Sequence, residues 1–440
     1  MNIVHYIMGI PPLRRGGLIR YAIDLAEEQA KQQHKVSIIY AGEIQGKNSR
    51  VSIKKRRKRA QVTYYEIINP LPVSVSTGMC DEKLFTANTD SAPYREFFID
   101  NKVQILHIHS LMGLHLELVE EAKKVGTKIV FTSHDYFGIC PKTDMIKDGT
   151  ICSEKNWEKC NMCCAAPISY HSIIRKQSHL FFYYLWLKQK ISGKHNGGKK
   201  NKKNIDEKGY DNINYELIRK YYKEIFLKID LMHYNSNLAK EIYERRLEPH
   251  KSVVYFVSHS DIKDKRTLRK EPEIVHIGYL GDSSEKKGYE ILFKALKEME
   301  TEYKSKFELE IYFEEKRKNS FIHQHKEYDI KELDRIFENM DLLIVPSQWA
   351  ETFGLVALEA ISHGVPIVVS ENVGAKDLLY RYPDAGMIIG TGKDEIKSAL
   401  IYLLENRKKI VNMSAYICEQ NMNLDYAEYV KKIIEIYKIA

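Results

Sequence analysis

Two glutamates and a glycine stand out in residues 346–379, which read PSQWAETFGLVALEAISHGVPIVVSENVGAKDLL. Gly354 precedes a stretch that predicts a helix, and the exposed N–H groups and the dipole at a helix start favour a phosphate. Glu359 lies further along that helix, where its carboxylate can accept hydrogen bonds from a ribose diol. Glu351 lies in the preceding loop and can contact a sugar hydroxyl. The alternative is a capped amphipathic helix with two incidental glutamates.

Two further turns could approach phosphate groups. The first contains Gly278 and Tyr279 at the end of an expected strand, followed by Lys286 and Lys287 before an expected helix. A lysine placed between strand and helix suits a diphosphate, although a surface lysine turn is the plainer alternative. The second contains the pair Gly16 and Gly17 after Arg14 and Arg15. Adjacent glycines allow the backbone to approach a ligand closely.

Histidines follow two neighbouring strands. His107 and His109 end the segment ILHIHS, and His134 with Asp135 ends VFTSHD. The carboxyl ends of parallel strands face the ligand crevice of an open α/β sheet. His134 and His109 are therefore candidates for the site, whereas hydrogen-bonded core histidines are the alternative.

Five of the seven cysteines fall between Cys140 and Cys164. The spacing of Cys160 and Cys163 is that of a metal knuckle, and Cys140 and Cys152 could complete four thiolate ligands for zinc. Clustering of this kind indicates metal binding more than disulfides in a reducing compartment. The cysteines predict a structural zinc site, with free thiols as the alternative.

The formal charge of +9 comes from two short segments. Residues 54–59 read KKRRKR, and residues 188–208 carry eight lysines against two carboxylates. The rest of the chain is close to neutral, which argues against nucleic acid as a partner and for local contact with anions such as lipid headgroups or diphosphates. A solvated loop would explain the first segment without any function.

No run of apolar residues approaches the roughly 20 that a membrane span needs. The N-terminal residues lack the features of a signal peptide, so we expect a cytoplasmic protein. The aromatic segment HLFFYYLWLKQK at residues 179–190 precedes the lysine-rich insertion. It could lie on the inner face of the cell membrane, making peripheral contact with anionic lipid, or pack on the first domain as core.

Strand-like and helix-like segments alternate along the chain, which predicts an α/β fold with doubly wound sheets. We expect a first domain at residues 1–249, containing the cysteine cluster 140–164 and the basic insertion 188–212. A second α/β domain is expected at residues 250–425, with Val253 to Val257 as its first strand. The final helix at 426–440 is expected to cross back to the first domain.

The chain resembles the retaining glycosyltransferases of family 4, the group 1 transferases with the GT-B fold. The resemblance rests on the glycine-rich first loop, the histidine pair, the lysine turn and the two-glutamate stretch, and it covers most of the chain. It implies two Rossmann-like domains that face a cleft. The donor would lie on the second domain and the acceptor mainly on the first.

The resemblance also implies roles for individual residues. Glu359 would hold the nucleotide ribose, Glu351 would contact the donor sugar, and Lys287 would neutralise the diphosphate. The remaining donor-binding residues would be Phe353, Gly354, Leu355, Gly278, Tyr279, Gly16, Gly17 and His109, with His134 near the donor sugar. The family usually has arginine directly after the first glycine of the lysine turn, where this chain has Tyr279.

These features predict a glycosyltransferase that moves a sugar from a nucleotide diphosphate sugar to an acceptor hydroxyl with retention. The acceptor would be a glycan or a lipid-linked glycan in cell-surface polysaccharide or glycoconjugate synthesis. No catalytic metal is expected, because lysine and helix N-termini stabilise the leaving diphosphate. The alternatives are a nucleotide-sugar epimerase of the same fold and a non-catalytic nucleotide-sugar-binding or scaffold protein.

Overall fold

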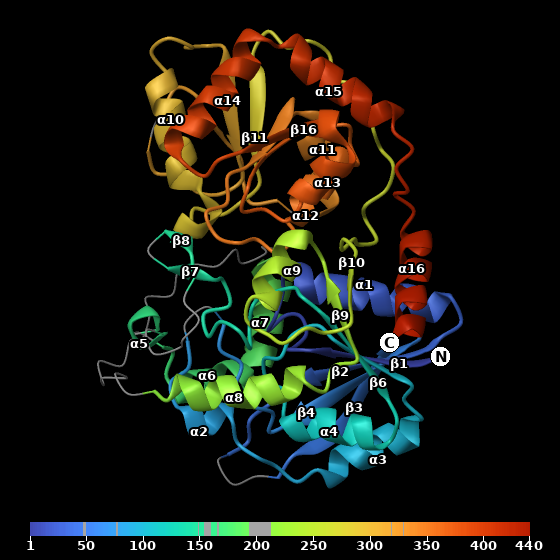
Figure 1. Cartoon of the computed structure of the whole chain (residues 1–440). Helices are drawn as coiled ribbons and strands as arrows, with labels where there is room; N and C mark the ends of the chain where they lie inside the picture. Colours follow the sequence, from blue (N-terminus) through green and yellow to red (C-terminus); the bar gives the residue numbers. More distant parts are fainter. Residues whose placement is uncertain are drawn as a thin grey trace.

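The computed structural model describes residues 1–46, 50–75, 78–147, 149–153, 160–164, 167–192, 213–317, 319–328 and 330–440. The described strands form two large sheets, one in each half of the chain, and a small hairpin (Figure 1). Most of the basic insertion, residues 193–212, lies outside the described residues.

The first sheet has the strand order β10-β9-β6-β5-β1-β2-β4-β3 and is parallel apart from the antiparallel edge strand β3. Its strands are β1 (Asn2–Ile7), β2 (Lys35–Ala41), β3 (Ser52–Arg59), β4 (Val62–Ile68), β5 (Ile105–Ile108), β6 (Lys128–Thr132), β9 (Leu231–Tyr234) and β10 (Ser252–Val254). The helices that accompany it are α1 (Gly17–Lys31), α2 (Glu82–Phe85), α3 (Ala92–Asn101), α4 (Leu116–Lys124), α6 (Tyr170–Gln177), α7 (His179–Ser192), α8 (Tyr215–Phe226) and α9 (Asn237–Glu244).

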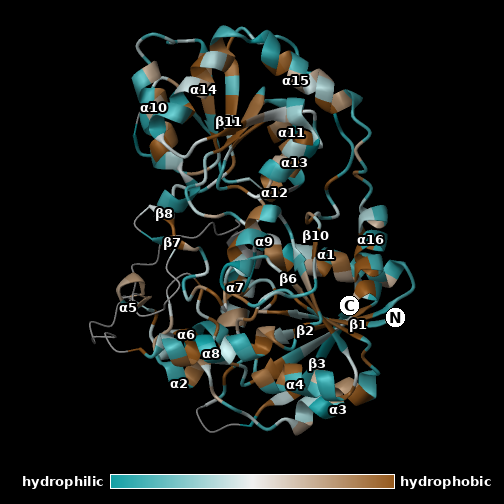
Figure 2. Cartoon of the chain, viewed as in Figure 1, coloured by the Kyte–Doolittle hydropathy of each residue, from teal (hydrophilic) through white to brown (hydrophobic). Residues whose placement is uncertain are grey.

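The central strand β1 is buried on both faces, as its continuous apolar run predicts. Because successive strand residues point to opposite faces, Val4 and Tyr6 pack into one core while Ile3 and Ile7 pack on the other side of the sheet. Figure 2 shows apolar residues gathered on the strands and on the inner faces of the helices.

The second sheet has the order β13-β12-β11-β14-β15-β16 and is parallel throughout the described strands. Its strands are β11 (Val275–Tyr279), β12 (Phe307–Ile311), β13 (Ile322–Gln324), β14 (Leu342–Val345), β15 (Ile367–Ser370) and β16 (Gly386–Ile389). Its helices are α10 (Tyr289–Met299), α11 (Leu333–Glu338), α12 (Leu355–Ile361), α13 (Lys376–Arg381), α14 (Lys393–Glu405) and α15 (Lys408–Glu419). Two parallel sheets with helical connections confirm the α/β fold class.

The strand β10 corrects one expectation. We expected Val253 to Val257 to open the second series, but Val253 pairs with His233 of β9 in the first sheet. A three-residue strand carries no sequence signal for its neighbour, so only the docked sheet shows which one it joins. The last strand of the first sheet therefore ends at Val254, and the second sheet begins at Val275.

The last helix, α16 (Tyr426–Ile439), packs against α1 at the N-terminal end of the molecule (Figure 1). Gln29 of α1 donates a hydrogen bond to the hydroxyl of Tyr437 over 3.0 Å, and the Tyr429 hydroxyl donates to that of Tyr21 over 3.0 Å. The chain thus returns from the second sheet to cover the first.

The basic run KKRRKR lies in the edge strand β3, where most of its side chains are exposed. Exposed positive charges on an edge strand discourage pairing with another chain, which is a structural reason for the run. In α7, Phe182 packs on the first domain, whereas Leu180, Tyr183 and Tyr184 are exposed. Among the described residues, no helix combines the length and apolar character that a membrane span requires.

Candidate functional site

Gly354 ends the loop that contains Glu351 and starts helix α12. Its φ of 95° is left-handed, and an added Cβ would lie 3.0 Å from Cγ1 of Val373. A side chain there would be both strained and crowded, so glycine is needed for this loop-to-helix turn. The turn directs the first turns of α12, including Glu359, toward the first domain.

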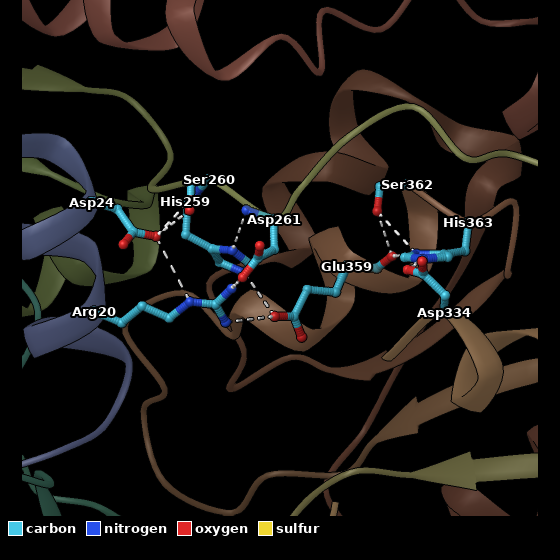
Figure 3. A network of polar contacts seen from close by, with 9 residues as sticks. All are labelled: Arg20, Asp24, His259, Ser260, Asp261, Asp334, Glu359, Ser362 and His363. Atoms are coloured by element: carbon cyan, nitrogen blue, oxygen red, sulfur yellow. Dashed lines mark hydrogen bonds and ion pairs between the residues drawn. The ribbon is translucent and has the colours of Figure 1, made fainter. Parts of the chain in front are cut away.

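Glu359 is 7% exposed and is held by residues from both halves of the chain (Figure 3). Its Oε1 lies 2.7 Å from Nε2 of His259 and 3.8 Å from the guanidinium of Arg20, on helix α1. Arg20 also pairs with Asp261 and lies 3.8 Å from Asp24. A carboxylate of the second domain is therefore bound by an arginine of the first.

The loop after β10 completes this network. The hydroxyl of Ser260 donates to Asp24 over 2.8 Å, and the Ser260 amide donates to the same oxygen over 3.1 Å. On the far side of α12, His363 lies 3.0 Å from Asp334 (Figure 3). The first contacts position the loop of His259, and the second holds the chain just after the helix that carries Glu359.

A cavity of about 690 Å³ lies beside Glu359. It is lined by Pro11, Pro12, Arg15, Gly16, Gly17, Ile19, Arg20, Ile23, Asp24, Trp186, Tyr328, Leu333, Leu355, Val356 and Glu359. The structure thus brings together four residues predicted for the donor site, namely Gly16, Gly17, Leu355 and Glu359. The side chain of Phe353 does not line this cavity; it is buried in the core and stacks on Phe256.

Lys287 and Glu351, predicted separately, form an ion pair. The Lys287 ammonium donates to Oε1 of Glu351 over 2.6 Å, and the Ser347 hydroxyl donates to Oε2 over 2.5 Å. Burial alone would raise the pKa of Glu351, but the charge and hydrogen bond of Lys287, with the Ser347 hydroxyl, hold that pKa below its usual value. Glu351 is therefore an anion held between a cation and a hydroxyl.

Tyr279, which stands where the family has arginine, braces the turn that carries Lys287. Its ring is 2% exposed, and its hydroxyl donates to the carbonyl of Asp282 over 2.7 Å, with the carbonyl of Lys287 at 3.3 Å. The hydroxyl is thus engaged by the backbone of the turn. Gly278 is explained by packing, since a Cβ there would lie 2.1 Å from the sulfur of Met340.

His134 meets the two-glutamate loop through its backbone. The hydroxyl of Thr352 donates to the His134 carbonyl over 3.0 Å, and the hydroxyl of Ser236 donates to the Thr352 carbonyl over 2.6 Å. The His134 ring is half-buried beside Tyr21, with ring centroids 4.7 Å apart. Burial lowers its pKa to about 3, so its imidazole is neutral.

His134 is also the outer end of a chain of buried hydrogen bonds. Its Nε2 lies 3.2 Å from Nδ1 of His109, whose Nε2 lies 2.9 Å from Nδ1 of His5. Nε2 of His5 lies 2.8 Å from Oε1 of Gln29, which in turn donates to Tyr437. Sequence reasoning identified His109 as a donor-site residue, but here it links His134 to the interior.

The inner half of this chain of hydrogen bonds runs from Tyr437 to the backbone just after β10. The Tyr437 hydroxyl lies 2.7 Å from Nδ1 of His107, and Nε2 of His107 lies 2.6 Å from the hydroxyl of Thr132. That hydroxyl lies 2.9 Å from Nδ1 of His233, whose Nε2 donates to the carbonyl of Tyr255 over 2.7 Å. The hydrogen bonds thus link side chains of four neighbouring strands, β1, β5, β6 and β9, to α16.

The carbonyl at the inner end sets the direction of every hydrogen bond. A carbonyl only accepts, so Nε2 of His233 carries a proton and its Nδ1 accepts. Burial lowers the pKa values of the chain's histidines, to about 4 for His5 and His233, so each ring is neutral and has one proton. The order propagates outward: His134 donates from Nε2 to His109, which leaves Nδ1 of His134 without a proton. The tautomer of His134 is therefore set by a carbonyl eight hydrogen bonds away.

Arg20, His259 and Tyr437 were missed by sequence reasoning. Arg20 follows the glycine pair by one helical turn, and this position on the helix face is the one signal that could have identified it. His259 and Tyr437 reach the site from segments far along the chain, and no local spacing marks them. Lys286, considered as a substitute for the missing arginine, lies over the Trp349 ring at 5.1 Å.

The five clustered cysteines lie in the first domain. Cys160 and Cys163 are at the two ends of α5 (Cys160–Cys163), after the hairpin of β7 (Ile146–Lys147) and β8 (Thr150–Ile151). Burial raises the pKa of the Cys140 thiol to about 11. Among the described residues, three groups bring metal-ligating atoms within 4.8 Å of one another, and they contain histidine and glutamate rather than cysteine. The structural zinc of Cys140, Cys152, Cys160 and Cys163 stays a prediction.

A second cavity of about 380 Å³ lies on the other side of the glycine-rich loop. It is lined by Met8, Gly9, Ile10, Leu13, Arg14, Tyr40, Ala41, Gly42, Arg56, Arg57, Glu66, Lys176, Gln177, His179 and Phe182. Arg14 faces this cavity and its neighbour Arg15 faces the first, so one loop separates the two. Burial lowers the pKa of Arg14 to about 10, which leaves it cationic at neutral pH.

A profile of the family Glycosyl transferases group 1 matches residues 242–420. This part of the chain is a group 1 glycosyltransferase domain. A 42.6 kDa protein of the cps region of Klebsiella pneumoniae is 22% identical over 75% of this chain and 74% of its own length. The first curated relatives are matched over only 8% to 36% of their lengths.

Solved structures extend the likeness of the group 1 domain to the fold of the whole chain. The sucrose-phosphate synthase of Thermosynechococcus elongatus has a TM-score of 0.59 and 12% identity, over 99% of this chain and 98% of that chain. Anabaena HepE, solved in complex with UDP and glucose, has a TM-score of 0.58 and 11% identity, over 100% and 99%. The GT-B fold with two Rossmann-like domains is confirmed.

Proposed function

We propose that this protein is a retaining glycosyltransferase that moves a sugar from a nucleotide diphosphate sugar to an acceptor hydroxyl. The observation that carries the proposal is the hydrogen bond from Thr352 to the carbonyl of His134. It joins the loop of Glu351 in the group 1 domain to the strand ends of the first domain. In this proposal the lysine turn and the neutral His134 would face the same donor.

The nucleoside would occupy the cavity beside Glu359. The two polar contacts of the Glu359 carboxylate within the described residues both use Oε1, so Oε2 is the oxygen that can accept from a ribose hydroxyl. His259 holds the carboxylate in place, and Tyr328 and Trp186 supply aromatic faces for a base. Arg15 and Arg20 supply positive charge for phosphates at the same cavity.

The leaving diphosphate gains negative charge as the glycosidic bond breaks, and fixed cations there lower the barrier most. Lys287 is the cation of the lysine turn, and its ion pair with Glu351 holds its ammonium group in position before the donor binds. Glu351 would exchange part of this ion pair for a hydroxyl of the donor sugar. The exposed N–H groups at the start of α12 would face the diphosphate.

His134 would position the donor sugar. Its Nδ1 carries a lone pair because the buried chain of hydrogen bonds places the proton on Nε2. That nitrogen can accept a hydrogen bond from a sugar hydroxyl, and the low pKa keeps it from competing as a cation. The proposed role is therefore orientation of the donor rather than proton transfer.

The acceptor would carry an anionic group beside the second cavity, where Arg14, Arg57 and Lys176 lie. A phosphate or uronic acid in a cell-surface glycan, or a lipid-linked diphosphate, has this chemistry. The proteins of the Klebsiella cps region support a place in polysaccharide synthesis. Lipid linkage would also suit the exposed aromatic residues of α7 and peripheral contact with an anionic membrane.

The test combines binding with turnover. The full-length protein is screened with UDP-, GDP- and ADP-sugars by thermal shift, and release of nucleoside diphosphate is then followed with the sugar that binds. Slow release without acceptor, and an α-linked product from an α-linked donor, support the proposal. Binding without release by any donor would favour the non-catalytic alternative, and an inverted product would refute retention.

A further inference from the structure

The exposed edge of the second sheet holds a cluster of imidazoles and carboxylates away from the candidate active site. Three neighbouring strands contribute: His276 from β11, Glu308 and Glu310 from β12, and His323 with His325 at β13. In the sheet register His276 is opposite Glu308, and Glu310 is opposite His323. Because strand neighbours share a face, the register itself brings these side chains together.

The ligand atoms converge on Glu310, which is 2% exposed. Nδ1 of His276 lies 2.9 Å and Nδ1 of His323 lies 3.2 Å from its carboxylate, and Nε2 of His325 contacts the second oxygen. Glu308 lies 3.7 Å from His276 and 4.0 Å from His323. Glu310 belongs to two groups of three, one with His323 and His325 and one with His276 and Glu308. Within each group the ligand atoms lie within 4.8 Å of one another.

These separations are those of a metal site. Ligands at about 2.0–2.1 Å from a tetrahedral Zn²⁺ lie roughly 3.3 Å from one another, close to the observed spacings. Imidazole with one carboxylate is a ligand set that suits zinc and its neighbours in the first transition row. Three imidazoles around one buried carboxylate also exceed what neutralising that carboxylate requires. The more exposed positions of His323 and His276 leave a path from solvent.

We propose that His323, His325 and Glu310 form a binding site for a divalent transition metal such as Zn²⁺, with His276 and Glu308 beside it. The metal would replace the imidazole protons that now face the carboxylate. It would hold the three-residue edge strand β13 to β12 more firmly than backbone hydrogen bonds alone.

Two aromatic rings connect this cluster to a wall of the cavity beside Glu359. The His325 ring stacks on Tyr312 with centroids 4.7 Å apart, and Tyr312 meets Tyr328 edge-on at 5.3 Å. Tyr328 lines the cavity beside Glu359. Metal binding at the sheet edge would therefore stiffen the segment between His325 and Tyr328.

Zn²⁺ binding to metal-free full-length protein is measured by calorimetry for the wild type, Glu310→Gln, His323→Ala and the control His171→Ala. His171 is an exposed histidine on α6, outside the cluster. We expect Glu310→Gln to lose one equivalent of Zn²⁺ and His323→Ala to bind that equivalent at least tenfold more weakly. The control should bind like the wild type.

Cobalt separates this site from the predicted cysteine site. Co²⁺ held by imidazole and carboxylate shows visible d–d bands without a thiolate charge-transfer band, and Glu310→Gln should remove those bands. Equal Zn²⁺ binding by all four proteins, or Co²⁺ bands of thiolate type alone, would overturn the proposal. If Glu310→Gln fails to fold, His323→Ala still tests the proposal, because the side chain of His323 is exposed and its removal should leave the fold intact. The readout is metal binding, so failure of the proposed transferase activity would leave it intact.

Discussion

The strand ends of the first sheet and the loops of the second hold their polar side chains in opposite ways. The first sheet carries neutral histidines in a buried chain that ends on the carbonyl of Tyr255. The second carries charged groups, with Lys287 against Glu351 and with Glu359 facing Arg20 of the first domain. The neutral side controls which hydrogen bonds are possible, and the charged side controls where negative charge is stable. Substitutions of the charged residues should therefore have different effects from substitutions in the histidine chain.

The largest effect is expected on the charged side, at Lys287. Lys287→Ala should lower turnover by a factor of 10² to 10³, or about 2.7–4 kcal/mol, as for the loss of a strong oxyanion donor. Donor affinity should fall less, because the charge on the diphosphate is greatest in the transition state. Steady-state kinetics with titrated donor measure both effects.

Lys286→Ala is the matched control, since Lys286 lies over Trp349 beside the same turn. Its effect should be much smaller. Near-normal turnover of Lys287→Ala would place the cation elsewhere, with Lys286, Arg14 and Arg15 as the next variants to examine.

The buried neutral histidines of the first sheet should make the free energy of unfolding depend on pH in the acidic range. Burial lowers the pKa of His5 to about 4. The unfolded chain, with a histidine pKa near 6.5, binds the proton more readily, so the free energy of unfolding falls as the pH drops from about 6.5 to 4. At about 1.4 kcal/mol per pKa unit, His5 alone accounts for on the order of 3 kcal/mol of unfolding free energy. This free energy is fully present above pH 6.5 and is lost as the pH falls to about 4.

Urea denaturation at several pH values measures this slope. His5→Gln should reduce the slope, whereas substitution of the exposed His171 by glutamine should not change it. A slope that is identical in the wild type and His5→Gln would show that the histidine chain is not held neutral by folding.

Glu359→Gln keeps the shape of the side chain and removes its charge. We expect weaker binding of nucleoside diphosphate by about 1–3 kcal/mol, the range for a hydrogen bond to a charged group. Calorimetry with the nucleotide that stabilises the wild type measures the change. Glu371→Gln, an exposed residue after β15, is the control, and unchanged affinity of Glu359→Gln would remove Glu359 from the nucleotide site.

The smallest effect on catalysis is expected from Tyr437→Phe, which breaks the histidine chain far from the donor. It leaves Gln29 and His107 each without one partner, which should cost about 1–3 kcal/mol of unfolding free energy. Turnover should fall several-fold because the proton position on His134 is no longer specified. Tyr402→Phe, on the exposed face of α14, serves as the control for stability and turnover. Full activity of Tyr437→Phe would show that the tautomer of His134 is set locally.

Several elements of the site could be predicted because their causes are local. The helix start at Gly354 follows from the residue types beside it, and Glu359 is placed by helix geometry. The rule that parallel strands end at one edge brought His109 and His134 together without knowledge of the sheet order. The two α/β halves likewise follow from the alternation of apolar segments.

The sequence by itself therefore determined the two parallel sheets, the helix that carries Glu359, and the edge at which the histidines gather. Only the tertiary structure decided that Arg20 binds Glu359, that Tyr437 joins the histidine chain and that β10 belongs to the first sheet. It also decided that the Tyr279 hydroxyl braces its own turn. The physical reason is that periodicity and spacing report the conformation of neighbouring residues, whereas these contacts depend on how separate elements pack against one another.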